Sequence, residues 1–275
     1  MDGAGDIPED WLSKYDIQVI PINIHFNNKI FRQGVDLSND DFYHLVETTG
    51  VIPKTSQPTP QQFVEFYTQI AQASDTILSV HVTSKLSGTY DSAVLAAEEL
   101  KNQLNIIPID SGSGSLAIGF MCKEIRQLEN SGATLPSILS RLNDIRQRVN
   151  IVLTLDTLEY ARLSGRVKAL QAALAALVKI KPIIILKDGA LDMREKVRTR
   201  QRAMDRVIEI IHERVNDRLI NIAVVHSQSL ETAKDLMNRV RETFQTNELI
   251  LSDLSIGIAA NLGPGTIGIV AYEVA

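Results

Sequence analysis

Two kinds of hydrophobic pattern alternate along the first half of the chain. Short runs rich in Ile and Val are typical of buried strands, and longer stretches with apolar residues three or four positions apart are typical of helices. The predicted strands are Ile17–Phe26, Thr76–Val82 and Asn105–Ile109. The predicted helices start after Ser38 and at Thr59, cover Ser92–Leu100, and lie near 114–130 and 134–148. This alternation predicts a mostly parallel sheet with helices on both faces.

Capping residues predict where two of these helices begin. Ser38 precedes Asn39 and two acidic residues, which is typical of a capped helix start with negative charge in the first turn. Thr59 precedes Pro60, which places a capping hydroxyl before a proline at the first helical position.

The second half of the chain mixes hairpin signals with helices. Asp188-Gly189 between two apolar runs indicates a hairpin turn. The predicted strands are 151–155, 182–186, 222–225, 248–259 and 266–273, and the predicted helices are 157–163, 167–178, 199–215 and 229–244. We therefore expect an α/β protein of two domains, 1–150 and 151–275, the second one smaller and with a mixed sheet. Because no Pro- or Ser-rich linker separates them, we expect the two domains to pack tightly.

Composition narrows the class of protein. The chain has 275 residues, of which 44% are apolar and 22% charged, as in a soluble globular protein. Its net charge of −5 disfavours a nucleic-acid binder. The single cysteine, Cys122, excludes an intrachain disulfide, fits a reducing cytoplasm, and is expected to be a buried core thiol.

Two segments were considered as a signal peptide and as a membrane-spanning helix. The N-terminus is acidic and lacks the basic start and apolar core of a signal peptide. The uncharged run between Asp253 and Glu273 is long enough for a membrane helix. Its four glycines, with Asn261 in the middle, favour two buried strands joined by a glycine turn. We expect no membrane span.

Four loop motifs stand apart from the core pattern: Asp2–Pro8, Lys54–Pro58, Ser84–Tyr90 and Asn261–Gly265. The third follows a predicted strand and opens a helix, where ligands of open α/β sheets bind. There, backbone N–H groups, a hydroxyl from Ser87 and close approach at Gly88 suit a carboxylate or a phosphate. Alternatively, Ser87 and Thr89 merely cap the helix.

The Lys54–Pro58 motif follows the same chemical logic. Thr55 and Ser56 are adjacent hydroxyls in a loop that Pro58 stiffens, and two hydroxyls plus backbone amides can hold an anion without a formal positive charge. An ordinary turn is the alternative. The presence of two such loops in one domain adds support for a shared anion site, and the alternatives of a helix cap and an ordinary turn stay open.

Other chemistries have less support in the sequence. A serine hydrolase needs a serine, a histidine base and an orienting acid, but no Gly-x-Ser-x-Gly elbow is present. The five histidines are scattered, without an HExxH or His-x-x-x-His pair, and neither a GxGxxG nor a Walker sequence occurs. A basic run between Arg194 and Arg206 predicts either a solvated helix start or a docking surface for a phosphorylated ligand or acidic partner, which Arg166 could join.

These motifs, in this order, resemble the DegV family over essentially the whole chain. The most specific pair is Lys54–Pro58 with Ser87–Tyr90. Further matching blocks are Ile109–Ser111, Ser164–Arg166, Glu195–Thr199 and Gly263–Gly265.

The resemblance implies a protein that binds one long-chain fatty acid in a buried apolar tunnel between two domains. It further implies that a separate, ATP-dependent kinase subunit phosphorylates the presented carboxylate for phospholipid synthesis. Carried over to this chain, Thr55 and Ser87 hold the carboxylate with Ser56 and Gly88 beside them, and the basic rim for the kinase includes Arg166 and Arg198. No catalytic residue, metal or cofactor other than the bound fatty acid is implied.

The chain departs from the family pattern in two places. Ala260-Asn261 stands where the family usually carries Thr-His; Asn261 can still line the head-group site as a donor, but it cannot titrate. The family also begins with a strand ahead of its Asp-Ser block, whereas here Asp2 is followed by Gly3. We therefore expect a late annotated start or a truncated chain, since a true absence would leave sheet edges unpaired.

Three functional classes remain open at this point. A lipid carrier without turnover is favoured. An enzyme that acts on a phosphorylated or acyl substrate at the same anion site is the competing class, and a fatty-acid binder without a kinase partner is the third. The length and unsaturation of the acyl chain depend on the shape of the tunnel.

Overall fold

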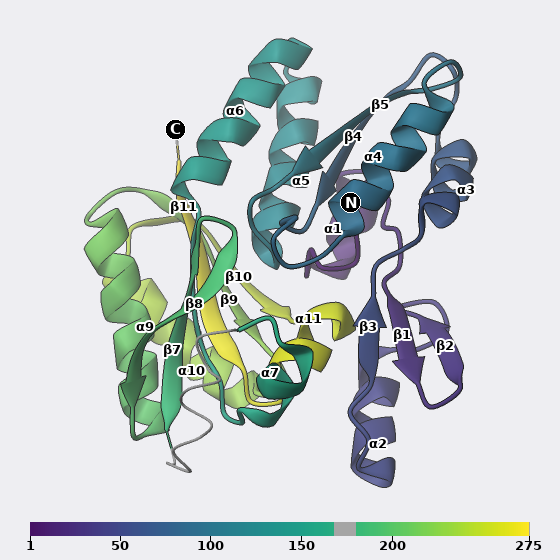
Figure 1. The fold of residues 1–275 in the computed structure, drawn as a ribbon. Coiled ribbons are helices and arrows are strands. Elements are labelled where there is room, and N and C mark those ends of the chain that lie inside the picture. Colours follow the sequence, from purple (N-terminus) through teal and green to yellow (C-terminus); the bar gives the residue numbers. More distant parts are fainter. Residues whose placement is uncertain (168–179, 275) are drawn as a thin grey trace. The chain divides into compact units, whose positions relative to one another are not determined.

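The computed structural model describes residues 1–167 and 180–274, and its ribbon is drawn in Figure 1. The chain divides into two compact units. Unit 1 consists of residues 1–138 and 255–257, and unit 2 of residues 139–254 and 258–275. The predicted helix over 167–178 lies almost entirely outside the described residues.

Unit 1 is built on a parallel pair of strands. β4 (Thr76–His81) pairs with β5 (Asn105–Asp110) in parallel register. Three helices pack around the pair: α3 (Pro60–Ile70), α4 (Thr89–Leu100) and α5 (Leu116–Asn130). Phe63 and Tyr67 of α3 and Ala93 and Ala96 of α4 form one buried cluster, against which Ile77 of β4 packs. This half also contains α1 (Glu9–Lys14) and part of α6 (Leu135–Arg148), which straddles the boundary between the units.

A second, antiparallel sheet of unit 1 was not expected from the sequence. Its order is β2-β1-β3, formed by Lys29–Arg32, Asn23–Phe26 and Lys54–Ser56, and α2 (Asn39–Thr49) lies between β2 and β3 in the chain. The predicted strand Ile17–Phe26 therefore splits: Ile20 bridges to Asp2, and only the last four residues enter this sheet. Pro21 lies at the split and cannot donate a ladder hydrogen bond.

The predicted helix starts are confirmed. Ser38 accepts a hydrogen bond from Asp41 N, and the Asp41 side chain reaches back to the cap, which makes a complete capping box. Thr59 and Gln62 form the same arrangement at α3, with Pro60 as the first helical residue.

Unit 2 holds a mixed six-stranded sheet in the order β10-β9-β11-β6-β7-β8. The strands are β6 (Asn150–Thr154), β7 (Lys181–Lys187), β8 (Ala190–Val197), β9 (Ile220–His226), β10 (Thr246–Asp253) and β11 (Ile267–Glu273). The β7–β8 hairpin turns at Asp188-Gly189, as predicted. The helices are α7 (Glu159–Ser164), α9 (Arg200–Val215), α10 (Leu230–Thr243) and α11 (Ile256–Leu262), whose first two residues belong to unit 1.

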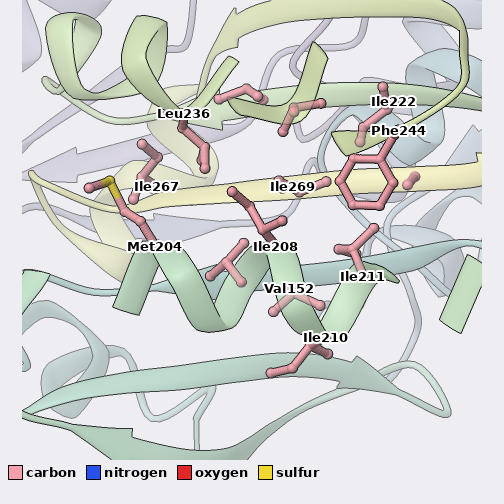
Figure 2. Close-up of a cluster of buried hydrophobic side chains, with 14 of the residues drawn as sticks. Val152, Met204, Ile208, Ile210, Ile211, Ile222, Leu236, Phe244, Ile267 and Ile269 are labelled. Atoms are coloured by element: carbon pink, nitrogen blue, oxygen red, sulfur yellow. The ribbon is translucent and has the colours of Figure 1, made fainter. Parts of the chain in front are cut away.

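The core of unit 2 lies between the sheet and helices α9 and α10. Figure 2 shows Ile208 and Ile211 of α9 facing Ile222 and Ile269 of the central strands. All are at least nine-tenths buried. Their burial stabilises the unit by about 1.5–3 kcal/mol for each side chain.

The fold class is confirmed as α/β with two domains, and a further local prediction, near the C-terminal end, is wrong. We expected a strand over 248–259 and a glycine turn, but the strand ends at Asp253 and α11 follows. A short uncharged apolar run fits a buried strand and a buried helix equally well, so the pattern could not separate them.

Candidate functional site

The Ser84–Tyr90 loop follows β4 and leads into α4, as the sequence predicted. The Ser87 hydroxyl lies 2.8 Å from that of Thr89, and the residue preceding the helix is Gly88, without a side-chain cap hydrogen bond. Gly88, and not Ser87, is therefore the N-cap residue of α4, although the Ser87 hydroxyl also accepts a weak hydrogen bond from Thr89 N, the first N–H of the helix, over 3.4 Å. The other N–H groups of the first turn and the positive end of the helix dipole favour an anion here.

The Lys54–Pro58 loop contains β3 and is held by the neighbouring strand β1. Thr55 pairs with Ile24 in the antiparallel register. The Ser56 hydroxyl lies 2.7 Å from His25 Nε2, and Asn23 Nδ2 donates to the carbonyl of Gln57 over 3.2 Å. Thr55 and Ser56 are both partly exposed. The two hydroxyls therefore lie on a strand whose backbone is held by hydrogen bonds from β1 along one edge.

The two loops are neighbours in space. A Cβ atom on Gly88 would lie 2.7 Å from Nε2 of Gln57, closer than such atoms approach each other. A side chain at position 88 would displace the Gln57 amide from this contact. The structure therefore brings the Thr55-Ser56 pair to the same region of unit 1 as Ser87 and Gly88.

A fully buried polar chain supports the strand that carries the Ser84–Tyr90 loop. Tyr67 donates to Ser79 Oγ over 2.8 Å, and Ser79 Oγ lies 2.8 Å from His81 Nε2. His81 Nδ1 in turn lies 3.2 Å from Asp2 Oδ2, which also accepts from Val82 N over 2.8 Å. The sequence analysis did not identify this chain, because its members are up to 79 residues apart.

The protonation of this chain follows from its hydrogen bonds. Burial alone would raise the pKa of Asp2, but the bonds from His81, Val82 and Ala4 outweigh it and lower the pKa below its ordinary value. Burial lowers the pKa of His81, so the ring is neutral. One directed chain then fits: Ser79 donates to Nε2, and Nδ1–H donates to the Asp2 carboxylate.

Ser79, His81 and Asp2 have the order of a hydrolase triad but not its accessibility. Ser79 is 3% exposed, and its hydroxyl already accepts a hydrogen bond from Tyr67. A nucleophile must reach a substrate carbonyl, so this arrangement supports the strand and does not carry catalysis.

Asp6, in the same N-terminal motif, is a second buried carboxylate. It accepts from the Ser115 hydroxyl over 2.6 Å and from Ser255 N over 2.8 Å. Burial raises its pKa to about 6, and these hydrogen bonds offset the effect only in part. The Asp2–Pro8 motif is therefore a structural anchor of unit 1.

The remaining motif residues gather in unit 2. Ser164 Oγ donates to the carbonyl of Asn261 over 3.2 Å, and Arg166 donates to the carbonyl of Ser164 over 2.8 Å. Gly263 and Gly265 follow with φ angles of +87° and +76°. The Ser164–Arg166 block and the Asn261–Gly265 loop thus form one cluster.

Most of the basic run between Arg194 and Arg206 is neutralised. Arg194 pairs with Glu213 at 2.8 Å, and Arg206 with Glu195 at 2.8 Å. Arg202 and Arg200 also have carboxylate neighbours. The broad positive surface that the sequence suggested is therefore much reduced.

Arg198 of that run and Arg166 outside it differ from these paired arginines. Within residues 1–167 and 180–274, Arg166 and Arg198 have no carboxylate partner. Burial lowers the pKa of Arg166, which is partly withdrawn from solvent, whereas Arg198 is exposed at the end of β8. A partly desolvated guanidinium without a carboxylate partner favours the approach of an anion.

Two further searches of the described residues gave negative results. No group of three or more His, Cys, Asp or Glu side chains is placed to hold a metal ion. Nor does any described helix combine the length and the apolar character that crossing a membrane requires.

Comparisons with curated proteins identify relatives of the whole chain. Protein DegV of Bacillus subtilis is 29% identical over 270 residues, which cover 98% of this chain and 96% of the relative. A DegV domain-containing protein of Halalkalibacterium halodurans is 31% identical over 256 residues, covering 92% and 90%.

Solved structures agree over the same length. A Thermus thermophilus protein described by "Fatty Acid Binding of a DegV family Protein" matches with a TM-score of 0.92 and 27% identity, covering 99% of this chain and 98% of its own. Bacillus subtilis DegV, described as a fatty acid binding protein, matches with a TM-score of 0.90 and 27% identity, covering 99% and 97%. The family model described as "Uncharacterised protein, DegV family" matches residues 1–274, so the chain belongs to the DegV family.

Proposed function

We propose that this protein binds one long-chain fatty acid and holds its carboxylate with the hydroxyls of Thr55, Ser56 and Ser87 and the N-terminus of α4 at Gly88. The observation that carries the proposal is the contact between the two hydroxyl-bearing loops at Gly88 and Gln57. The fatty acid binding described for the Thermus thermophilus and Bacillus subtilis relatives supports the same ligand.

The chemistry of the head-group site suits a ligand whose tail supplies the affinity. Each buried methylene contributes about 0.8 kcal/mol, so a dozen contribute on the order of 10 kcal/mol before the cost of ordering the ligand. The head group then needs only neutral donors. A carboxylate held by hydroxyls stays reactive, whereas a bidentate arginine would mask it.

We also propose that the bound carboxylate is presented to an ATP-dependent kinase, which forms an acyl phosphate for phospholipid synthesis in the cytoplasm. Arg166 and Arg198 support this step, because neither has a carboxylate partner within the described part of the chain and a guanidinium can pair with a phosphate or an acidic partner. The protein itself acts as a carrier without turnover. Asn261 is retained as a neutral donor to the head group, in place of the family's histidine.

Binding can be tested with single hydroxyl deletions. A hydrogen bond to a charged group contributes about 1.5–3 kcal/mol, so Ser87→Ala and Thr55→Ala should each weaken fatty acid binding about 10- to 100-fold. Isothermal titration with oleate measures the Kd. The matched controls, Ser13→Ala and Thr68→Ala, remove exposed hydroxyls on helices α1 and α3 and should leave the Kd unchanged.

Native mass spectrometry separates the carrier from an enzyme that uses the same site. A carrier should be purified with one fatty acid per chain and release it unchanged. A protein without bound lipid that turns over an acyl or phosphorylated substrate would contradict the proposal. Unchanged Kd values for both hydroxyl variants would show that the head group lies elsewhere.

A further inference from the structure

The Ile109–Ser111 block lies at the end of β5 and takes no part in the proposed carboxylate contacts. Asp110 is the last residue of β5 and is paired in parallel register with His81, the last residue of β4. The carboxyl ends of parallel strands meet at one edge of a sheet, which is where ligands of open α/β folds bind. The Asp110 side chain therefore starts beside the loop that carries Ser87.

The Asp110 carboxylate binds both of the loops that leave this edge. Its Oδ2 accepts a hydrogen bond from the Ser84 hydroxyl over 2.7 Å, and its Oδ1 accepts from the Ser84 backbone N–H over 3.3 Å. Oδ1 also accepts from Gly112 N over 2.8 Å, which makes an Asx turn in the β5–α5 loop. Because hydrogen bonds to a carboxylate are stronger than those between neutral groups, Asp110 is a firm anchor for Ser84.

Ser84 is the second residue of a tight turn, 83–87, that ends at Ser87. The carbonyl of Thr83 accepts from Leu86 N over 3.0 Å and from Ser87 N over 3.3 Å, which closes the turn. Thr83 N donates to the carbonyl of Ser113, in the β5–α5 loop, over 2.8 Å. The first residue of the turn is therefore held by the backbone of the neighbouring loop, and the second residue is held by the aspartate.

Helix α4 is anchored independently of this turn. Ala93 and Ala96 of α4 are fully buried in the cluster that the helix shares with α3. Ser84, by contrast, is exposed, and its hydroxyl already donates to Asp110. Loss of the aspartate would thus loosen the turn that ends at Ser87 and leave the body of the helix in place.

We propose that Asp110 is a positioning residue for fatty acid binding: through Ser84 it holds the 83–87 turn in the geometry in which the Ser87 hydroxyl reaches the carboxylate. This inference rests on the proposed function and deepens it. If Asp110 acts through Ser87, its effect on affinity cannot exceed that of the Ser87 hydroxyl, and it disappears when that hydroxyl is removed. A double-mutant cycle measures such a dependence directly.

Isothermal titration of the full-length variants with oleate gives the Kd values for this cycle. Asp110→Ala removes the whole anchor and should weaken binding about 10-fold. Ser84→Ala removes only the hydroxyl bond and should weaken binding about threefold. Introduced into Ser87→Ala, either substitution should change the Kd by less than about twofold.

A conservative variant and two matched controls separate positioning from a general effect on the fold. Asp110→Asn keeps an oxygen for the backbone N–H groups and an amide that can donate to the neighbouring hydroxyl, so the Kd should stay within about threefold. Asp75→Ala removes a carboxylate that accepts from Gln72 N over 2.8 Å, just ahead of β4. Ser131→Ala removes an exposed hydroxyl that donates to Leu128 O over 2.7 Å. Both controls should leave the Kd unchanged.

The outcomes distinguish this inference from the proposed function. If Ser87→Ala weakens binding and Asp110→Ala does not, the positioning role is overturned and the head-group site stands. Fully additive effects would also overturn it, because the aspartate would then act without Ser87. An unchanged Kd for Ser87→Ala would overturn both proposals. Urea unfolding shows whether each variant is folded during titration; if Asp110→Ala is not, the cycle of Ser84→Ala with Ser87→Ala decides on the same criteria.

Discussion

The raised pKa of Asp6 makes the stability of unit 1 depend on pH in an unusual direction. An acid whose pKa is higher in the folded state binds its proton more tightly in that state. The free energy of unfolding therefore falls as the pH rises from the pKa of the unfolded state to the pKa of the folded state, and it does not change at higher pH. The pKa rises from 3.8 to about 6, a difference that corresponds to about 3 kcal/mol of stability. This contribution to the free energy of unfolding is present below pH 4 and is lost by pH 7.

Asp6→Asn removes the titration while keeping the contacts. The amide oxygen can accept from Ser255 N, and the Ser115 hydroxyl can turn to accept from the amide nitrogen. Asn also tolerates the φ of +46° at this position. We expect Asp6→Asn and the unmodified protein to be equally stable near pH 4, and the variant to be about 3 kcal/mol more stable at pH 7.

Urea unfolding followed by the fluorescence of Trp11 measures this difference, because Trp11 is the single tryptophan and is buried in unit 1. Asp188→Asn is the matched control: Asp188 is exposed in the β7–β8 turn and also has a positive φ, of +49°. Its effect should stay within about 0.5 kcal/mol at every pH. A stability difference for Asp6→Asn that does not change between pH 4 and 7 would refute the reasoning.

Two further substitutions test other parts of the argument. Asp2→Ala leaves the Val82 and Ala4 N–H groups and the His81 ring without their acceptor, and should lower the free energy of unfolding by about 3–5 kcal/mol in the same urea assay. Arg198→Glu should reduce phosphorylation of the bound fatty acid by a partner kinase at least tenfold while leaving its Kd unchanged; a parallel loss of fatty acid affinity would show that Arg198 does not act at a partner surface.

The local elements of this fold were largely readable from the sequence. Ser38 and Thr59 satisfy helix-end donors from within three residues, so their capping boxes need no distant contact. The Asp188-Gly189 turn likewise depends on the backbone preferences of two residues. The strand β3 and its antiparallel pairing with β1 were missed, because a pairing between segments about 30 residues apart gives no local sequence signal when the strands are only three or four residues long.

The sequence predicted which residues belong to the candidate site, but it did not predict how they are arranged in space. The sequence indicated Thr55, Ser56, Ser87 and Gly88 by their chemistry and by the resemblance to a family. It gave no sign that Gln57 is the side chain against which Gly88 packs, since that contact joins two loops 31 positions apart. The ion pairs could not be predicted for the same reason. Glu213 follows its partner Arg194 by 19 residues, and Glu195 precedes its partner Arg206 by 11 residues.

By itself the sequence determined the α/β class, the hydroxyl-rich loops, the buried Cys122 and the family. Periodicity, capping and turn chemistry act over a few residues, and a family motif is a linear string. The tertiary structure decided which polar groups are buried and what they contact. Asp2 and His81 are 79 residues apart in the sequence, and folding places them 3.2 Å apart with both side chains fully buried, where burial lowers the pKa of His81 and the hydrogen bond from His81 helps to lower the pKa of Asp2.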